Sequence, residues 1–266
     1  MDPLEKYNAR AKKVNSLLCV GLDADITKIP ERFLKMEHPQ YEFNKWIINE
    51  THVYTAAYKP NSAFYEARGD QGIKELKMTI EYLQKNYPDI FTILDSKRAD
   101  IGNTNNGYAE STFDWFGFDA VTLNPYLGFE AISPFIGRKD KVSIILCRTS
   151  NPGSGEFQEL NIDNKPLWQI VAEHSKAINE NSNNLMLVTG ATYPNEIIKL
   201  REVCGEMTFL VPGVGAQGAV LSDFIPQGLN KNKLGLIINS GRAIIFNDNP
   251  RLAAENTKNE INKLII

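Results

Sequence analysis

The stretch IFTILDSKRADIGNT, residues 90–104, joins an apolar run to a dense group of charged side chains. The run IFTIL has the length and composition of a strand that is buried on both faces. Asp95, Lys97, Arg98 and Asp100 follow it within six residues. Charges at the end of a buried strand are costly unless they pair with other groups. The stretch therefore predicts a parallel strand whose carboxyl end carries functional charges.

Similar apolar runs, bounded by Gly, Asp, Asn or Pro, recur along the chain. With the first they cover residues 17–22, 54–60, 90–95, 118–123, 142–147, 185–190, 207–213 and 234–240. Segments with helical spacing lie between several of them, including 72–89 and 193–205, where Asn195 is a candidate N-cap and Gly205 a candidate stop. This alternation predicts an α/β fold, a (β/α)8 TIM barrel, as a single domain over residues 1–266. A doubly wound open sheet is the structural alternative.

Composition narrows the class of protein. The chain of 266 residues is 42% apolar and carries a formal net charge of -3. This charge argues against nucleic acid or an anionic membrane as the main partner. No run is long enough to span a bilayer, and three widely spaced cysteines imply no disulfide framework. We expect a soluble cytoplasmic protein with Cys19 and Cys147 as buried free thiols.

Charged residues end several of the predicted strands. Asp23 follows the first run, and Lys59 and Asn61 lie at the end of the second. In a barrel these ends meet at one rim, where active sites lie. Asp95 and Lys97, two positions apart, are expected to share a face. No Ser-His-Asp or Cys-His set and no histidine pair at metal-binding spacing is apparent, so acid–base work falls on lysine and aspartate.

The segment VPGVGAQG, residues 211–218, contains the spacing G-x-G-x-x-G. A dinucleotide-binding interpretation fails, because this motif should open the first βαβ unit and be followed by an acidic residue at the next strand end. Glycines after the seventh strand and NSGR after the eighth, residues 239–242, are instead typical of a barrel phosphate site. Arg242 is the expected cation for that phosphate.

Seven segments together resemble one known family. They are GLDAD, YKPNSAFYE, DSKRADIGNT, TLNPYLG, CRTSNPGSGEFQ, VPGVGAQG and NSGRAIIF, in this order between residues 17 and 246. DSKRAD matches the D-x-K-x-x-D motif of orotidine 5'-phosphate decarboxylase. The chain is most similar to the longer bacterial subgroup of that family.

The resemblance implies decarboxylation of orotidine 5'-phosphate to uridine 5'-phosphate, the last step of pyrimidine synthesis, without a metal or an organic cofactor. It also implies a homodimer with shared active sites. Lys97 would be the proton donor, Asp95 would lie near the substrate carboxylate, and Lys59 would complete the network. Asp100 and Thr104 would come from the partner subunit. The remaining expected contacts are Asp23 and Lys59 to ribose, Ser150 to the pyrimidine, and Gln217, Gly241 and Arg242 to phosphate, with Asn61 as a weaker assignment.

Two alternatives remain open at this stage. Hexulose-phosphate synthases and keto-gulonate-phosphate decarboxylases share the D-x-K-x-x-D string but need magnesium held by carboxylates. Lys59 and the TSNPG segment, residues 149–153, favour the pyrimidine enzyme. A non-catalytic protein that binds nucleotide phosphate is the second alternative. The alternating charges argue against it, because a binding module has no use for a desolvated charge network.

Overall fold

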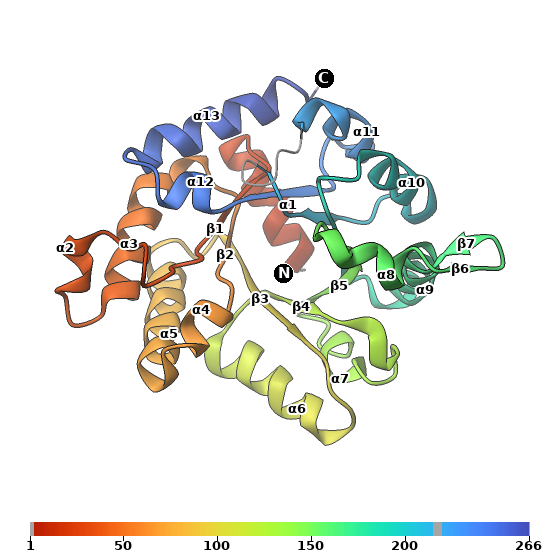
Figure 1. The fold of residues 1–266 in the computed structure, drawn as a ribbon, viewed down its shortest axis with the longest axis horizontal. Helices are drawn as coiled ribbons and strands as arrows, with labels where there is room; N and C mark the ends of the chain where they lie inside the picture. The colour runs from red at the N-terminus through yellow and green to blue at the C-terminus, as the bar shows by residue number, and fades with distance from the viewer. Residues whose placement is uncertain (1–2, 215–219, 266) are drawn as a thin grey trace.

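The computed structural model describes residues 3–214 and 220–265. Eight parallel strands close into a barrel in the order β1-β10-β9-β8-β5-β4-β3-β2. Helices surround these strands (Figure 1). The predicted (β/α)8 barrel is confirmed, and the open-sheet alternative is wrong because the sheet closes through the pairing of β1 with β10.

Each predicted apolar run coincides with one barrel strand, although β3 and β5 extend past the ends of their runs. The strands are β1 (Leu18–Gly21), β2 (Ala57–Lys59), β3 (Phe91–Arg98), β4 (Ala120–Leu123), β5 (Val142–Arg148), β8 (Leu185–Thr189), β9 (Phe209–Val211) and β10 (Leu236–Ser240). The α-helices are α1 (Pro3–Val14), α2 (Glu31–Leu34), α3 (Pro39–Thr51), α4 (Ala63–Glu66), α5 (Gly69–Asn86), α6 (Asn103–Ala109), α7 (Ser133–Ile136), α8 (Gly155–Gln158), α9 (Leu167–Ser182), α10 (Pro194–Cys204), α11 (Ile225–Gly228), α12 (Arg242–Ile245) and α13 (Pro250–Asn262). Shorter turns are η1 (His52–Tyr54), η3 (Pro125–Leu127), η4 (Pro152–Ser154) and η5 (Leu221–Asp223), with a π-helical segment η2 (Glu110–Phe116).

The strand registers determine which side chains point into the barrel. Directly paired residues of parallel strands face the same side, and successive residues alternate. Gly21 of β1 pairs with Lys59 of β2. Cys19 lies two positions before Gly21 in β1, so Cys19 and Lys59 face the same side of the sheet. The same rule gives one interior set near the strand ends, which contains Lys59, Asp95, Thr122, Leu146, Val188 and Leu210. The upper barrel interior is therefore polar along β2, β3 and β4 and apolar along β5, β8 and β9.

Helix α1 covers the opposite, amino-terminal end of the barrel. The Tyr7 hydroxyl donates to the carbonyl of Leu236 at 2.6 Å, where β10 begins. Lys6 forms an ion pair of 2.7 Å with Asp119, just before β4. These contacts close the amino-terminal end, so the carboxyl ends form the open mouth.

The helix boundaries follow the sequence signals with one exception. The apolar stripe of α5 is buried at Leu76, Ile80 and Leu83. Helix α10 ends before Gly205, whose φ of 57° lies in the left-handed region that glycine adopts without steric strain. The predicted N-cap at Asn195 is wrong. Pro194 opens the helix, because the first helical position tolerates its missing N–H.

The segment 149–166 between β5 and α9 has structure that the sequence did not predict. It holds η4, α8 and a two-stranded hairpin of β6 (Asn161–Ile162) and β7 (Lys165–Pro166). The hairpin projects outside the ring of helices (Figure 1). Helix α9 begins at Leu167, as expected.

All three cysteines are free and buried, as predicted for Cys19 and Cys147. Within the described part of the chain, no helix combines the length and apolar character that crossing a membrane requires.

Candidate active site

A cavity of about 420 Å³ opens at the carboxyl ends of the strands. It is lined by Lys59, Asp95, Lys97, Thr122, Leu146, Thr149, Ser150, Asn151, Gln158, Val188, Leu210 and Pro212. The first four form its polar side and are called here the charge network. Leu146, Val188 and Leu210 form an apolar side opposite them. The predicted functional residues of β2 and β3 therefore share one cavity.

Asp95 is the centre of the charge network. Its Oδ2 lies 2.8 Å from Lys59 Nζ, and its Oδ1 lies 2.6 Å from Lys97 Nζ. Thr122 Oγ1 donates to Asp95 Oδ1 at 3.0 Å. The Lys59 side chain is only 4% exposed, whereas that of Lys97 is 48% exposed. Lys59 is thus a buried partner of Asp95, and Lys97 stands at the accessible side of the cavity.

Mutual attraction keeps these groups charged. Burial alone would raise the pKa of the Asp95 carboxyl, but Lys59 and Lys97 outweigh it and hold that pKa well below its usual range. Burial alone would lower the pKa of Lys59, and here Asp95 and Asp23 outweigh it and raise that pKa. The network therefore presents an ionised carboxylate between two ammonium groups.

The Lys97 backbone departs from regular strand geometry. The pairing of β3 with β4 shifts between Leu94 and Arg98, and Lys97 has a φ of 48°. A lysine in this left-handed region is strained by about 1–3 kcal/mol. Its N–H donates to Thr122 Oγ1 at 2.9 Å, which satisfies a group that the irregular ladder leaves unpaired. Lys97 does meet Asp95, as the spacing predicted, but through a distorted strand end.

Arg98 leaves the cavity. Its guanidinium forms an ion pair with Glu66 and lies 5.0 Å from the ring centre of Tyr108. It therefore joins α4 to α6 and is a structural residue, in line with its omission from the predicted site.

Asp23 lies where the ends of β1 and β10 meet. Its Oδ1 is buried without a hydrogen-bond partner among the described residues. Gly241 faces it closely, since a Cβ atom on that glycine would lie 3.5 Å from Asp23 Oδ2. A Cβ atom on Gly21 would lie 3.1 Å from Gly241 Cα, so the absence of side chains on both glycines leaves room at this corner of the mouth.

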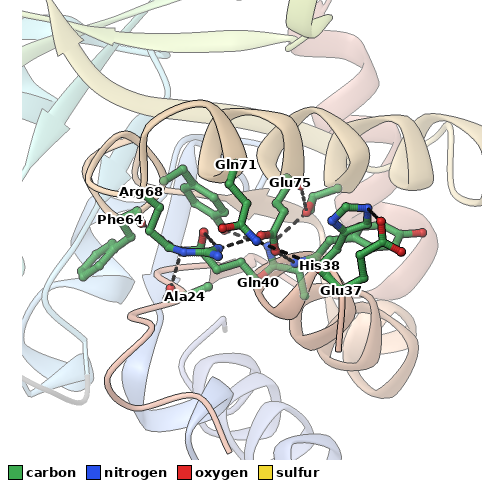
Figure 2. Close-up of polar contacts among 12 residues, drawn as sticks. Ala24, Glu37, His38, Gln40, Phe64, Arg68, Gln71 and Glu75 are labelled. Carbon is green, nitrogen blue, oxygen red and sulfur yellow. Dashed lines mark hydrogen bonds and ion pairs between the residues drawn. The ribbon is translucent and has the colours of Figure 1, made fainter. Parts of the chain in front are cut away.

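A buried network holds the loops that carry Asp23 and follow Lys59. Gln40 Nε2 donates to the carbonyls of Ala24 at 2.7 Å and Phe64 at 2.9 Å. Figure 2 shows Gln40 among these groups, with Arg68 beside it. Arg68 Nη1 donates to Gln40 Oε1 at 2.8 Å and pairs with the fully buried Glu75 at 2.7 Å. The loops after β1 and β2 are therefore fixed to each other and to α5.

Asp100 and Thr104 lie apart from the charge network of their own chain. Asp100 accepts from the N–H of Ile101 at 2.7 Å and has no ion-pair partner within residues 3–214 and 220–265. Thr104 is exposed in the first turn of α6. Asn61 also serves local structure, because its Oδ1 accepts from the N–H of Ala63 at 3.1 Å.

Ser150, which lines the cavity, lies against Gly190, the residue directly after β8. A Cβ atom on Gly190 would lie 2.8 Å from Ser150 Cβ and 2.9 Å from its Cα and N. Gly190 N also donates to the carbonyl of Arg148 at 2.8 Å. The backbone of the Ser150 segment therefore packs directly on the end of β8.

Arg148 anchors the same segment from beneath. Its side chain is fully buried and pairs with Glu159 and with Glu196, the latter at 2.5 Å. It also donates to Ser154 Oγ at 2.7 Å and stacks 3.8 Å from the ring centre of Tyr193. One guanidinium thus joins the segment after β5 to the start of α10.

The predicted phosphate residues are partly described. Gly241 and Arg242 follow β10, with Arg242 exposed at the start of α12. Gln217 lies outside the described residues. No group of three or more His, Cys, Asp or Glu residues suited to a metal ion occurs in the described part of the chain.

Comparison with known proteins identifies the family. A family model described as "Orotidine 5'-phosphate decarboxylase / HUMPS family" matches residues 16–257. The chain belongs to the orotidine 5'-phosphate decarboxylase family. A family member of that name from Flavobacterium johnsoniae is 47% identical over 94% of this chain and 90% of its own length. Another from Christiangramia forsetii is 49% identical over 88% of this chain and 85% of its own length.

Solved structures of the family agree in fold. The Leishmania donovani OMP decarboxylase matches with a TM-score of 0.89 and 36% identity, covering 100% of this chain and 99% of that one. The agreement in length and fold is consistent with the longer subgroup that the sequence indicated.

Several residues of this orotidine 5'-phosphate decarboxylase family site were not predicted. Thr122 lies within the quoted TLNPYLG segment, but nothing in that string shows that its hydroxyl joins Asp95 to the Lys97 backbone. Gln158 lines the cavity and exchanges hydrogen bonds with Thr149 at 2.9 Å. The polar residues of CRTSNPGSGEFQ were the available signal for it.

Proposed function

We propose that Lys97 is the proton donor in the decarboxylation of orotidine 5'-phosphate to uridine 5'-phosphate. Family membership assigns this reaction to the chain, which is a carbon–carbon lyase of pyrimidine biosynthesis. The observation that carries the assignment of the acid is the Asp95 carboxylate held between Lys59 and Lys97 in the cavity. Of the two lysines, Lys97 is the accessible one.

The chemistry fits this arrangement. Loss of CO2 leaves an electron pair on a ring carbon, in an orbital that the ring π-system does not delocalise. A fixed ammonium stabilises that charge and then delivers a proton to the same carbon. Asp95 Oδ1 accepts a hydrogen bond from Lys97 Nζ at 2.6 Å and so orients the ammonium group in the cavity.

Asp95 has a second effect on the bound substrate. A carboxylate beside the substrate carboxylate repels it, and this repulsion ends when neutral CO2 departs. The apolar side of the cavity, Leu146, Val188 and Leu210, excludes water and strengthens these electrostatic interactions. Binding of the distant phosphate supplies the free energy that offsets the repulsion.

The remaining contacts divide by position on the rim. Asp23, Lys59 and Asn61 hold ribose hydroxyls, together with Thr104 from the partner. Ser150 meets the pyrimidine. Gln217, Gly241 and Arg242 hold the phosphate. Apart from Thr104, these groups come from one barrel domain, and the location is cytoplasmic.

A second copy of the chain completes the site. Asp100 has a carboxylate with no cationic partner in its own described chain, and it lies beyond the end of β3. Exposed apolar side chains flank it on the loops after β3 and β4, where Ile101 is 64%, Tyr126 80% and Leu127 48% exposed. Apolar residues this exposed favour a protein contact. A homodimer through this rim brings Asp100 and Thr104 to the neighbouring cavity.

Loss of orotidine 5'-phosphate absorbance in the presence of a chelator tests the function. We expect full activity with chelator, since the proposed reaction uses no metal or organic cofactor. The family model also covers hexulose-phosphate enzymes, so activity that is abolished by chelator and restored by magnesium would contradict the proposal. Tight binding of uridine 5'-phosphate without any turnover of substrate would indicate a binding protein.

A further inference from the structure

Asn239 points into the barrel although it lies in the apolar strand β10. Its Cα partner in β1 is Cys19, and Cys19 shares the interior side with Lys59. On the other side of β10, Ile237 pairs with the interior residue Leu210, and Asn239 lies two positions after Ile237. The pairing with β1 and the pairing with β9 therefore both place the Asn239 side chain on the interior side, because side chains alternate along a strand.

The Asn239 side chain is buried and has an unused acceptor. The residue is 8% exposed, and its Oδ1 has no hydrogen-bond partner among the described residues. Asp23 Oδ1, nearby at the end of β1, is in the same condition. Leaving a buried polar group unpaired costs on the order of 1–3 kcal/mol. Such a departure from satisfied packing is expected at a functional site.

Two glycines keep this corner open. A Cβ atom on Gly21 would lie 3.4 Å from Asn239 Oδ1, and one on Gly241 would lie 3.5 Å from Asp23 Oδ2. The two side chains therefore border one glycine-walled corner of the mouth. Their free oxygens are acceptors, and a carboxylate beside a carbonyl oxygen repels a phosphate. A ligand hydroxyl suits this corner, because it can donate a hydrogen bond to either oxygen.

We propose that the Asn239 carboxamide oxygen accepts a hydrogen bond from a ribose hydroxyl of the bound nucleotide, beside Asp23. The assignment rests on the proposed function, which supplies the nucleotide. The pyrimidine is excluded as the partner by position, since Ser150 follows β5 and the barrel order places β9 and β8 between β5 and β10. Asn239 is thus a substrate-binding residue that the motifs do not reveal.

The test measures binding of uridine 5'-phosphate and of its 2'-deoxy and 3'-deoxy forms by calorimetry. Asn239→Leu keeps the branched shape and removes the hydrogen bond. We expect its Kd for uridine 5'-phosphate to rise about tenfold, the effect of one lost hydrogen bond. For the deoxy form that lacks the bonded hydroxyl, variant and wild type are expected to bind equally. The melting temperature of the free variant stays the same or rises, because leucine removes an unpaired buried amide.

Ser143→Ala is the matched control. Ser143 is fully buried with an unpartnered Oγ, but it lies at the other end of the barrel, near the start of β5. We expect it to leave all three affinities unchanged. Equal affinities of wild type and Asn239→Leu for uridine 5'-phosphate would overturn the assignment, as would the same loss for all three ligands. A wild type that fails to bind uridine 5'-phosphate would overturn the proposed function and this assignment together.

Discussion

Lys59 Nζ lies 2.8 Å from Asp95 Oδ2, and the lysine side chain of this pair is almost completely buried. A buried ion pair of this kind is weak evidence for stability, because desolvation offsets most of the attraction. The ion pair instead holds the Asp95 carboxylate in one orientation. With one oxygen occupied by Lys59, Asp95 presents the other to Lys97 and orients it toward the cavity.

Replacing Lys97 by alanine is expected to abolish turnover and preserve the fold. Removal of a catalytic acid that also stabilises developing charge lowers kcat by at least about 10³-fold. Lys59 still neutralises Asp95, so uridine 5'-phosphate binding persists. Steady-state kinetics and calorimetry check this, with the exposed Lys35→Ala as control. Decarboxylation by the Lys97→Ala variant at a near wild-type rate would show that Lys97 is not the proton donor.

The stability of the protein is expected to fall in acid because of Asp95. The pKa of its carboxyl is depressed in the folded state, so its contribution is fully present above the unfolded aspartate pKa of about 3.9. That contribution is lost as the pH falls from there toward the lower folded-state pKa. Urea unfolding between pH 3 and 7 measures the effect.

Asp95→Asn provides the comparison for this acid dependence. The variant leaves Lys59 buried without its counterion, which costs about 3–5 kcal/mol at neutral pH. Its stability is expected to change less than that of the wild type as the pH falls. An identical pH dependence in both proteins would show that other groups cause the acid effect.

Gly190→Ala is expected to weaken nucleotide binding without strain in its own backbone. The added methyl group would stand 2.8 Å from Ser150 Cβ and must displace that segment. We predict at least about a tenfold rise in KM, the loss of one hydrogen bond to the base. Gly153→Ala in the same segment has room, with its nearest neighbour, Asn151 Nδ2, at 3.8 Å, and is expected to behave as wild type. Equal KM values for the two variants would argue against the packing of Ser150 on β8.

Mixing the inactive variants Asp100→Asn and Lys97→Ala is expected to restore activity. In a hybrid dimer one site collects both substitutions and the other is intact. Random exchange of equal amounts therefore yields about one quarter of wild-type activity. Mass spectrometry verifies the exchange, and no recovery after complete exchange would contradict a shared site.

The sequence predicted the barrel because buried parallel strands are short apolar runs between breakers, and each of those runs became a strand. It also placed Asp95 and Lys97 together. It did not predict the irregular backbone at Lys97, the contact of Gly190 with Ser150 or the inward direction of Asn239. These depend on register and on neighbours far away in the chain, which local patterns do not contain. Arg148 was missed for the same reason, since its two carboxylates come from separate segments.

The amino-terminal end of the barrel is closed by contacts between residues that are far apart in the sequence, and this affects the order in which the chain can fold. Tyr7 of α1 bonds to Leu236 of β10, a partner 229 positions later, and Asn262 of α13 donates to the carbonyl of Asn15 at 2.8 Å. Helix α1 also contacts earlier segments, since Tyr7 packs on Phe91 and Arg10 pairs with Asp89, but its bond to β10 can form only after that strand is made. Contacts of such long sequence separation slow folding. In this chain the contact between the first helix and the last strand is therefore among the late steps that close the barrel.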